Sequence, residues 1–250
     1  MEAVQQAHYH ALGRDYFWLA GKRRIAFTLL RQSLGAPEES MNRRVLDVGC
    51  GPGHELQDLQ PFGICCGLDA SFPALQRCQQ EHAGAPWLIC ASGDRFPFQD
   101  HSFDLVVMLD VLEHIEADAE CLRECTRVLK PGGRLLLTVP AFQWLWGTHD
   151  EQYGHKRRYT VPELRRKVTG AGFAIDQVTY VEWIFTLPLW LMRRMKQRIP
   201  FLARQDDFIR VPGWLNAWLT WLIGLETVWL RRHSLPLGVS IVCIARFQDR

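Results

Sequence analysis

The sequence has 250 residues, a length that suits one α/β domain with a substantial hydrophobic core. Apolar residues make up 48% of the chain and charged residues 22%, a composition that is typical of a globular protein and excludes intrinsic disorder. The formal net charge of +2 is too small for a surface that coats nucleic acid, so nucleic acid is not an expected partner.

The eight cysteines form no CxxC pair and no clustered Cys/His spacing, so the sequence predicts neither a disulfide framework nor a metal site. Residues 1–10 have neither the basic nor the apolar region of a signal peptide. We therefore expect reduced thiols and a cytoplasmic protein.

The first 140 residues predict strands that alternate with helices. Residues 2–34 are expected to be helical, with a break at Gly21 as one alternative. Helices are also expected up to Leu59, after an N-cap at Ser71, and over 115–129. The predicted strands are continuously apolar, which is typical of a parallel sheet covered on both faces, and they span 44–49, 63–69, 87–91, 103–109 and 134–139.

The pattern changes after Pro140. A loop over 141–160 is followed by an expected helix at 162–171 and by strands at 173–183 and 238–247. Residues 184–234 are not needed to complete the sheet and predict an apolar helical insertion before the last strand. We expect a single domain over 1–250, divided into a helical lid over 1–40, a sheet core over 41–183 and 235–250, and the insertion over 184–234.

The run VLDVGCGPG (45–53) predicts a nucleotide-binding loop, because glycines let the backbone turn sharply at a strand end and let a ligand come close. Asp69 ends the next strand, where its carboxylate can accept hydrogen bonds from both ribose hydroxyls. Asp94 follows the third strand, within reach of an adenine amino group. These positions together indicate a nucleoside ligand.

Two ligands compete for this loop. A dinucleotide fingerprint needs a small residue at position 54, which is His here. Asp47 would repel a pyrophosphate, but it suits the ammonium group of an amino acid. The sequence therefore favours S-adenosylmethionine over NAD(P) and over a purely structural glycine turn.

The runs VLDVGCGPG, GLDAS, GDRFPFQDHSFDLVV, LEHI and LKPGGRLLLTVP, over roughly residues 43–140, resemble the class I S-adenosylmethionine-dependent methyltransferases. The resemblance implies a doubly wound, Rossmann-like sheet of seven mostly parallel strands, with the last strand antiparallel. The cofactor-binding residues that it implies are Asp47, Gly49, Cys50, Gly51 and Gly53 for the methionyl part, Asp69 and Ala70 for the ribose, Asp94 and Arg95 for the adenine, and Leu109 beside them.

Two further segments are similar to a narrower bacterial subgroup, whose members are often found near glycan or lipid biosynthesis. YFWLAGKRRIAFTLL (16–30) resembles its aromatic-x-Gly-Arg-Arg segment, although Lys22 stands where Arg is more usual. THDEQYGHKRRYT (148–160) resembles its Gly-His-x-Arg-Arg-Tyr loop.

This second segment predicts the acceptor site. We interpret His149, Asp150, His155 and Tyr159 as candidate catalytic residues, and Arg157 and Arg158 as groups that bind an anionic acceptor bidentately. The alternative is a solvent-exposed, salt-bridged loop whose tyrosine caps the core. Methyl transfer is an in-line displacement, so a base is needed only when the acceptor must lose a proton.

Other residues have two interpretations each. Glu113 and His114 lie near the sulfonium or serve packing and helix electrostatics. One interpretation of the N-terminal helix is a lid over the cofactor formed by Trp18, Lys22, Arg23 and Arg24. The other is a helix face of Phe17, Trp18 and Ile25 packed on the sheet, with the basic residues solvated. The end of the fourth predicted strand lacks the Asn/Asp-Pro-Pro-aromatic run of methylases that act on exocyclic base amines, which also disfavours nucleic acid.

The insertion holds five of the ten tryptophans, and its stretch 214–230 is at the lower limit of length for a membrane span and contains Glu226. Trp214, Trp218, Trp221 and Trp229 follow one helical stripe, flanked by Arg210 and Arg231. Aromatic and basic residues together suit a membrane interface or a pocket for a lipid tail, and the equally weighted alternative is a buried helical pair or a homodimer contact that covers the active site.

We therefore expect an enzyme that transfers a methyl group from S-adenosylmethionine to a small-molecule or lipid-linked, anionic acceptor. The expected location is the cytoplasm, with peripheral contact to the inner membrane face as a further expectation. The alternative is a cofactor-binding regulatory or scaffold protein that has lost turnover.

Overall fold

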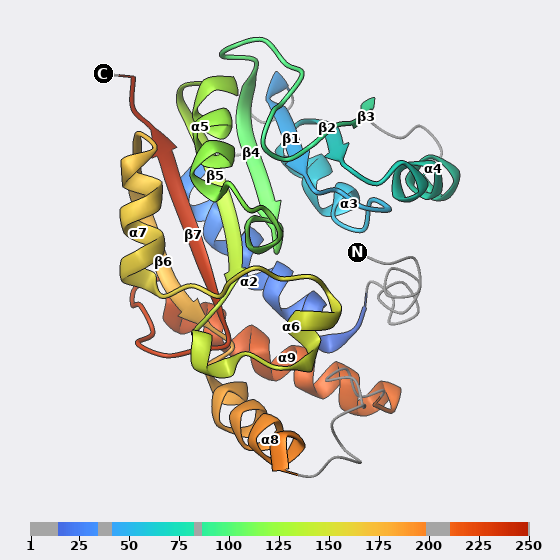
Figure 1. Ribbon diagram of the computed structural model, residues 1–250, viewed down its shortest axis with the longest axis vertical. Coiled ribbons are helices and arrows are strands. Elements are labelled where there is room, and N and C mark those ends of the chain that lie inside the picture. The colour runs from blue at the N-terminus through green and yellow to red at the C-terminus, as the bar shows by residue number, and fades with distance from the viewer. Residues whose placement is uncertain (1–14, 35–41, 83–86, 199–210, 250) are drawn as a thin grey trace.

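A seven-stranded sheet forms the centre of the protein (Figure 1). The computed structural model describes residues 15–34, 42–82, 87–198 and 211–249. The strands are arranged in the order β3-β2-β1-β4-β5-β7-β6. Their bounds are β1 Arg44–Val48, β2 Ile64–Asp69, β3 Trp87–Cys90, β4 Phe103–Leu109, β5 Leu129–Pro140, β6 Phe173–Val181 and β7 Ser240–Phe247.

Strands β1 to β5 pair in parallel, and β7 lies antiparallel between β5 and β6. The predicted fold class, with its antiparallel last strand, is therefore confirmed. In the register of the sheet, Asp47 lies beside Gly67 on one side and Val107 on the other. Because these strands run the same way, their carboxyl ends meet at one edge of the sheet, where such folds bind their ligands.

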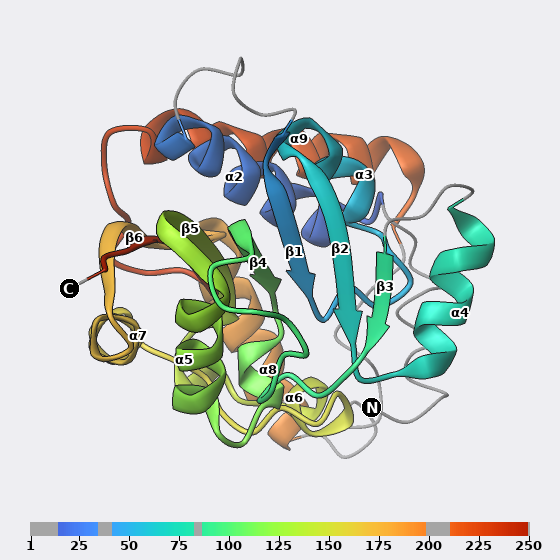
Figure 2. The ribbon, with the colours of Figure 1, turned by 90° about the horizontal axis from the view of Figure 1, so that it is seen from above.

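Helices cover both faces of the sheet, and Figure 2 shows them on either side of the strands. Neighbouring strand residues point to opposite faces, so Val106 packs in one hydrophobic cluster and Val107 in the other. Helices α5 (Asp118–Val128) and α7 (Val161–Gly170) contribute to the first cluster. The second cluster holds side chains of α2 (Phe17–Leu34), α3 (Leu56–Leu59), α4 (Phe72–Glu81) and α9 (Gly213–Leu230).

Five of the remaining helical segments follow β4, β5 or β6, and they are η3 (Leu112–His114), η4 (Gln143–Leu145), α6 (Thr148–Gln152), η5 (Trp183–Phe185) and α8 (Thr186–Arg198). The short segment η2 (Gln60–Phe62) instead precedes β2, at the opposite edge of the sheet. The predicted N-cap is confirmed, because the Ser71 hydroxyl accepts a hydrogen bond from the Ala74 amide at the start of α4.

Three boundaries differ from the sequence-based expectation. Helix α2 continues through Gly21, because the glycine serves close packing and Ile223 of α9 occupies the space of its missing side chain. Strand β5 begins at Leu129, which pairs with Phe103, so the Lys-Pro-Gly-Gly turn lies within the strand as an irregularity. The loop predicted over 141–160 contains the short helix α6.

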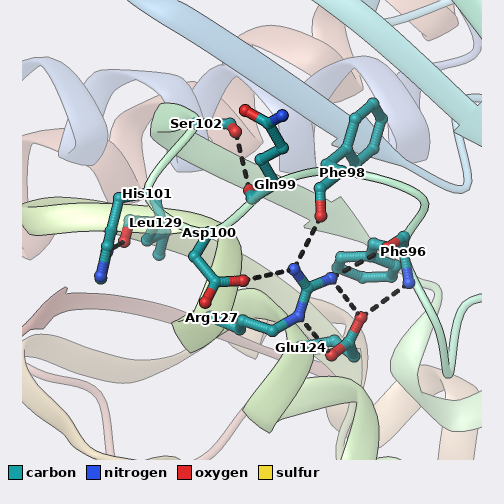
Figure 3. Close-up of polar contacts among 9 residues, drawn as sticks. All are labelled: Phe96, Phe98, Gln99, Asp100, His101, Ser102, Glu124, Arg127 and Leu129. Atoms are coloured by element: carbon teal, nitrogen blue, oxygen red, sulfur yellow. Dashed lines mark hydrogen bonds and ion pairs between the residues drawn. The ribbon is translucent and has the colours of Figure 1, made fainter.

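The Arg127 side chain of α5 holds the loop between β3 and β4 through hydrogen bonds (Figure 3). Arg127 uses all five of its N–H donors, on both carboxylate oxygens of Glu124, one oxygen of Asp100, and the carbonyls of Phe96 and Phe98. This planar, five-donor geometry is specific to arginine. The loop that follows Asp94 is therefore held at a fixed position on α5.

Candidate active site

A cavity of about 220 Å³ opens where strands β2, β4 and β5 end, at Asp69, Leu109 and Pro140. Helices α2 and α8 and the start of β7 close its sides. One part is lined by the loop after β1, with Gly49, Cys50, Gly51, Pro52, His54 and Glu55. The other part is lined by polar side chains, which are Lys22, Asp110, Glu113, His114, His149, Tyr153, His155, Arg158, Arg193 and Ser240.

The glycine loop leaves room for a ligand. Gly49 has φ +74°, and a Cβ there would lie 2.4 Å from a methyl group of Val111, so only glycine fits. Gly51 has φ +51° and lines the cavity, and no protein atom lies within 4 Å of the position of a Cβ. A side chain at Gly51 would therefore enter the cavity itself.

Asp69 is positioned by the same loop. Its Oδ2 accepts a hydrogen bond from the Gly51 amide at 2.8 Å, and its Oδ1 accepts one from the Ser71 amide at 2.7 Å. A carboxylate oxygen can accept more than one hydrogen bond, so both oxygens still have acceptor capacity for a ribose diol.

Asp47 is buried, and its Oδ2 has no hydrogen-bond partner among the described residues. Burial raises the pKa of Asp47 well above its usual range, and the carboxylates of Glu55 and Asp69 raise it further. A cationic group at the loop would offset the electrostatic repulsion among the carboxylates of Asp47, Glu55 and Asp69. The residues of this part of the cavity therefore fit a nucleoside that carries an ammonium group, as S-adenosylmethionine does.

Four of the predicted cofactor residues lie outside the cavity lining, as does Asp47. Gly53 packs against Cys78 of α4, because a Cβ there would lie 2.6 Å from the Cys78 sulfur. The other three residues, Ala70, Asp94 and Arg95, are exposed.

On the acceptor side, Lys22 of α2 pairs with Asp110, the residue after β4. The Thr138 hydroxyl donates a further hydrogen bond to Asp110 at 3.0 Å. Burial alone would raise the pKa of Asp110, but the Lys22 ammonium holds it below its usual range. Phe17 and Ile25 of α2 pack in the core as the packed-helix interpretation expects, but Lys22 and Arg23 are buried and not solvated, and Trp18 and Lys22 line the cavity.

Asp150 is fully buried, and its carboxylate accepts hydrogen bonds from four groups. Its carboxylate is bonded to His155 Nδ1 at 2.9 Å, Arg158 Nε at 2.7 Å, Arg193 Nη1 at 3.2 Å and the Gly147 amide at 2.8 Å. Burial alone would raise its pKa, but these partners hold the pKa of Asp150 well below its usual range. The Asp150 carboxylate therefore fixes the positions of His155, Arg158 and Arg193.

The structure separates the remaining predicted residues into two groups. His149, His155 and Arg158 line the cavity. Tyr159 is fully buried in the core and donates a hydrogen bond to Asp118, because its bridge to Ala141 turns it toward the sheet. Tyr159 is therefore not a candidate for catalysis.

Arg157 also lies outside the cavity lining. It pairs with Asp118 at 3.0 Å and donates a hydrogen bond to the Glu116 carbonyl. Its guanidinium is therefore already bound by groups outside the cavity, and the prediction that it binds the acceptor is corrected on this ground.

Glu113 and His114 face the cavity from the segment after β4. Glu113 is fully buried, and burial raises its pKa well above its usual range, with a further contribution from Asp110. Burial lowers the pKa of His114 to about 4, so this ring is neutral at pH 7.

Sequence reasoning missed one cavity cation altogether. Arg193 lies on α8, 43 positions along the chain from its partner Asp150. Nothing in the local sequence distinguishes it from the exposed Arg194 beside it. Its role depends on how α8 packs across the cavity.

Residues 46–137 match the family described as a methyltransferase domain. The demethylmenaquinone methyltransferase of Lactiplantibacillus plantarum is 34% identical over 133 residues, which cover 46% of this chain and 56% of that protein. A phthiotriol/phenolphthiotriol dimycocerosates methyltransferase of Mycobacterium ulcerans is 36% identical over 106 residues, or 40% of this chain and 38% of that protein. The chain spans about half the length of the first curated relatives it matches.

Solved structures share the fold. A Mesorhizobium loti S-adenosylmethionine-dependent methyltransferase superposes with a TM-score of 0.55 at 18% identity, covering 88% of this chain and 95% of that chain. Haemonchus contortus phosphoethanolamine N-methyltransferase 2, solved with S-adenosylmethionine, gives 0.57 at 20% identity over 90% of this chain and 52% of that chain.

The family match covers the part of the chain that forms β1 to β5. Residues 46–137 match a methyltransferase domain, and the sheet has the fold of the solved S-adenosylmethionine-dependent methyltransferases. The matched range stops before α6 and α8, which contribute His149, Leu189 and Arg193 to the cavity lining, and before α9.

Proposed function

We propose that the protein transfers a methyl group from S-adenosylmethionine to a small-molecule or lipid-linked acceptor that carries an anionic group. The observation that supports this function is the continuity of the cavity, which joins the glycine loop and Asp69 to the cations Lys22, Arg158 and Arg193. When bound, the cofactor supplies an electrophilic methyl group for in-line displacement.

Three features of the chain support the transfer itself. Apolar side chains of α2 and α8, among them Trp18 and Leu189, line the cavity and exclude water from the reacting atoms. Arg158 and Arg193 are held by Asp150, so their positions are fixed before an acceptor arrives. His149 and His155 are the candidate bases for an acceptor that must lose a proton.

A lipid-linked acceptor is favoured by the surface beside the cavity. The stripe of exposed apolar side chains on α9 consists of Trp214, Trp218, Trp221, Leu225, Val228 and Trp229. Relatives whose names specify demethylmenaquinone and phthiotriol dimycocerosates as substrates add to this argument. In the described part of the chain, no helix has the length and hydropathy needed to cross a bilayer, so we propose peripheral contact with a membrane.

The test is a screen of anionic small molecules and lipid-linked acceptors with cofactor carrying a labelled methyl group. Arg158→Ala should lower turnover at least tenfold and leave S-adenosylhomocysteine affinity within about twofold, because Arg158 lies in the acceptor part. Arg157→Ala is the matched control and should retain turnover. Since Arg158 is buried, calorimetry with S-adenosylhomocysteine also reports whether the variant folds.

The proposal fails if no acceptor yields S-adenosylhomocysteine above background while the cofactor binds normally. That result would favour the regulatory or scaffold alternative. Equal loss of turnover in both arginine variants would leave methyl transfer intact as a function but reject the proposed acceptor site.

A further inference from the structure

Three metal-ligating side chains meet in the acceptor part of the cavity. Glu113, His114 and His155 each offer one ligand atom, and these atoms all lie within 4.8 Å of one another. Glu113 and His114 come from η3 after β4, and His155 comes from the segment after α6. The spacing along the sequence gave no sign of this cluster, because 41 positions separate His114 from His155.

Glu113 is the strongest indication that the cluster binds a ligand. Its side chain is fully buried and lines the cavity, and neither carboxylate oxygen has a hydrogen-bond partner among the described residues. A buried carboxyl group is expected to be paired or to coordinate a cation. Lys22 of the same cavity is already paired with Asp110.

Both histidines are held in fixed orientations. Asp150 accepts a hydrogen bond from Nδ1 of His155, which leaves Nε2 for a ligand. The His114 ring is hydrogen-bonded to the backbone of Gly154, and the two rings meet edge to face at 81° with centroids 4.7 Å apart. A carboxylate or carbonyl behind each imidazole is the usual outer shell of a metal-bound histidine.

We propose that Glu113, His114 and His155 bind one divalent first-row transition-metal ion. Two imidazole nitrogens and one carboxylate oxygen are a frequent three-residue set for zinc, iron and related ions with open coordination positions. The open positions would face the cavity. If the proposed function holds, they would take an oxygen atom of the acceptor, such as a hydroxyl, carboxylate or phosphate oxygen, and His149 would be the candidate base, because both nitrogens of His155 would then be bound.

The test is a titration of untagged, chelator-treated protein with Co²⁺, followed by calorimetry and visible absorption, with and without S-adenosylhomocysteine. We expect one ion per chain. Glu113→Gln and His155→Gln should each weaken Co²⁺ binding at least tenfold. His233→Gln, at an exposed histidine beyond the end of α9, is the matched control and should bind Co²⁺ as the wild type does.

Two further measurements distinguish ion binding at this cluster from ion binding by cysteines and from loss of folding. Cys90 is an exposed thiol, so the titrations use a Cys90→Ser background, and thiolate-to-cobalt absorption would identify binding by another cysteine. Unchanged S-adenosylhomocysteine affinity shows that the variants fold. No bound ion under either condition, or equal binding by the wild type and both cluster variants, overturns the metal site.

Metal binding is measured without any acceptor, so its failure leaves methyl transfer untouched. Conversely, a protein that binds Co²⁺ through these residues but shows no turnover would reject the proposed function and retain the site.

Discussion

At the scale of single residues, the glycine loop gives the sharpest prediction. Gly51→Val requires a β-branched residue at φ +51° and directs its side chain into the cavity. Asp69→Ala removes the two oxygens that we expect to accept hydrogen bonds from the ribose. We expect each variant to weaken S-adenosylhomocysteine binding at least tenfold, which is about 1.4 kcal/mol.

Calorimetry on the folded variants measures this effect. Gly132→Ala provides a control for the backbone, because Gly132 also has a positive φ but lies outside the cavity lining. Unchanged affinity in both Gly51→Val and Asp69→Ala would reject this part of the cavity as the cofactor site.

A second residue follows from Figure 3. Arg127→Lys keeps the positive charge but replaces five planar donors by an ammonium group that cannot reach all of the same acceptors. We expect the loop after Asp94 to become more mobile, with faster amide hydrogen exchange at residues 96–102 and little change in β4. Uniform exchange rates in the variant and the wild type would show that the loop does not depend on this arginine.

The sequence predicted only part of the cavity lining, and it did so best at the ends of β1 and β2. Gly49, Gly51 and Asp69 follow directly from strand ends, where position along the chain fixes position in space. The direction of loop side chains is set instead by contacts with distant segments. For this reason Tyr159 turns to the core, and Arg193 enters the cavity from the insertion.

At the scale of secondary-structure elements, the contact between α2 and α9 depends on one glycine. A Cβ at Gly21 would lie 2.6 to 2.9 Å from three side-chain atoms of Ile223, so Gly21→Ala should separate the two helices. We expect a loss of about 1–3 kcal/mol in the free energy of unfolding, larger than the gain in helix propensity.

Urea unfolding measures this loss. The matched control is Gly170→Ala at the end of α7, where no atom lies within 4 Å of the new Cβ. Its stability should be unchanged or rise by up to about 1 kcal/mol. Equal stability of the two variants would show that α9 can shift to accommodate the methyl group.

A second prediction at this scale concerns the junction of β6, η5 and β7. Glu182 is fully buried there and accepts a hydrogen bond from Ser240 at 2.7 Å, and burial raises its pKa to about 7. The unfolded chain has a glutamate pKa of about 4.3, so between these values the folded protein holds the proton more tightly. The stabilising contribution is therefore complete below about pH 4.3 and is lost as the pH rises through 7.

Glu182→Gln removes this dependence, because the amide is neutral at every pH. Between pH 5.5 and pH 8, we expect the wild type to lose about 2 kcal/mol more than the variant. Urea unfolding at both pH values measures the difference. Glu226, whose pKa burial also raises to about 7, should leave some pH dependence in the variant. Identical pH profiles would contradict the assignment to Glu182.

At the scale of the whole molecule, α8 and α9 lie in the lower part of the view in Figure 1, away from α5. Both helices of the predicted insertion are described, while residues 199–210, which include Arg210, lie outside the described residues. The exposed apolar residues of α9 recur three or four positions apart, and exposed arginines lie at the ends of both helices, namely Arg194, Arg198, Arg231 and Arg232. Such a surface suits an anionic bilayer interface.

We predict that the protein co-sediments with anionic liposomes, much less with neutral ones, and that salt weakens this binding. Trp218→Ser combined with Trp221→Ser should reduce binding without loss of cofactor affinity. Trp87→Ser is the matched control, because Trp87 is 83% exposed but lies on β3 at the opposite edge of the sheet from β6. If α9 instead forms a homodimer contact, liposomes will not be bound, and light scattering will show a change of mass in the double variant.

The whole fold could be predicted largely because its strands are short, apolar and separated by clear turn residues. The family resemblance implied only that the last strand is antiparallel, and its place between β5 and β6 was not predicted, since no local pattern reveals that the last strand lies between two others. The packing of α9 on α2 was not predicted for the same reason.

The position of β7 has a consequence for how the molecule forms during synthesis. Among the described strands, β7 follows all the others along the chain and is the only one that pairs with β6, and Val239 and Ser240 line the cavity. A nascent chain can therefore assemble the parallel half of the sheet, with its glycine loop and Asp69, while β6 still exposes an unpaired edge. The glycine loop and Asp69 can therefore form before β7 joins β6 to the sheet and completes the wall of the cavity.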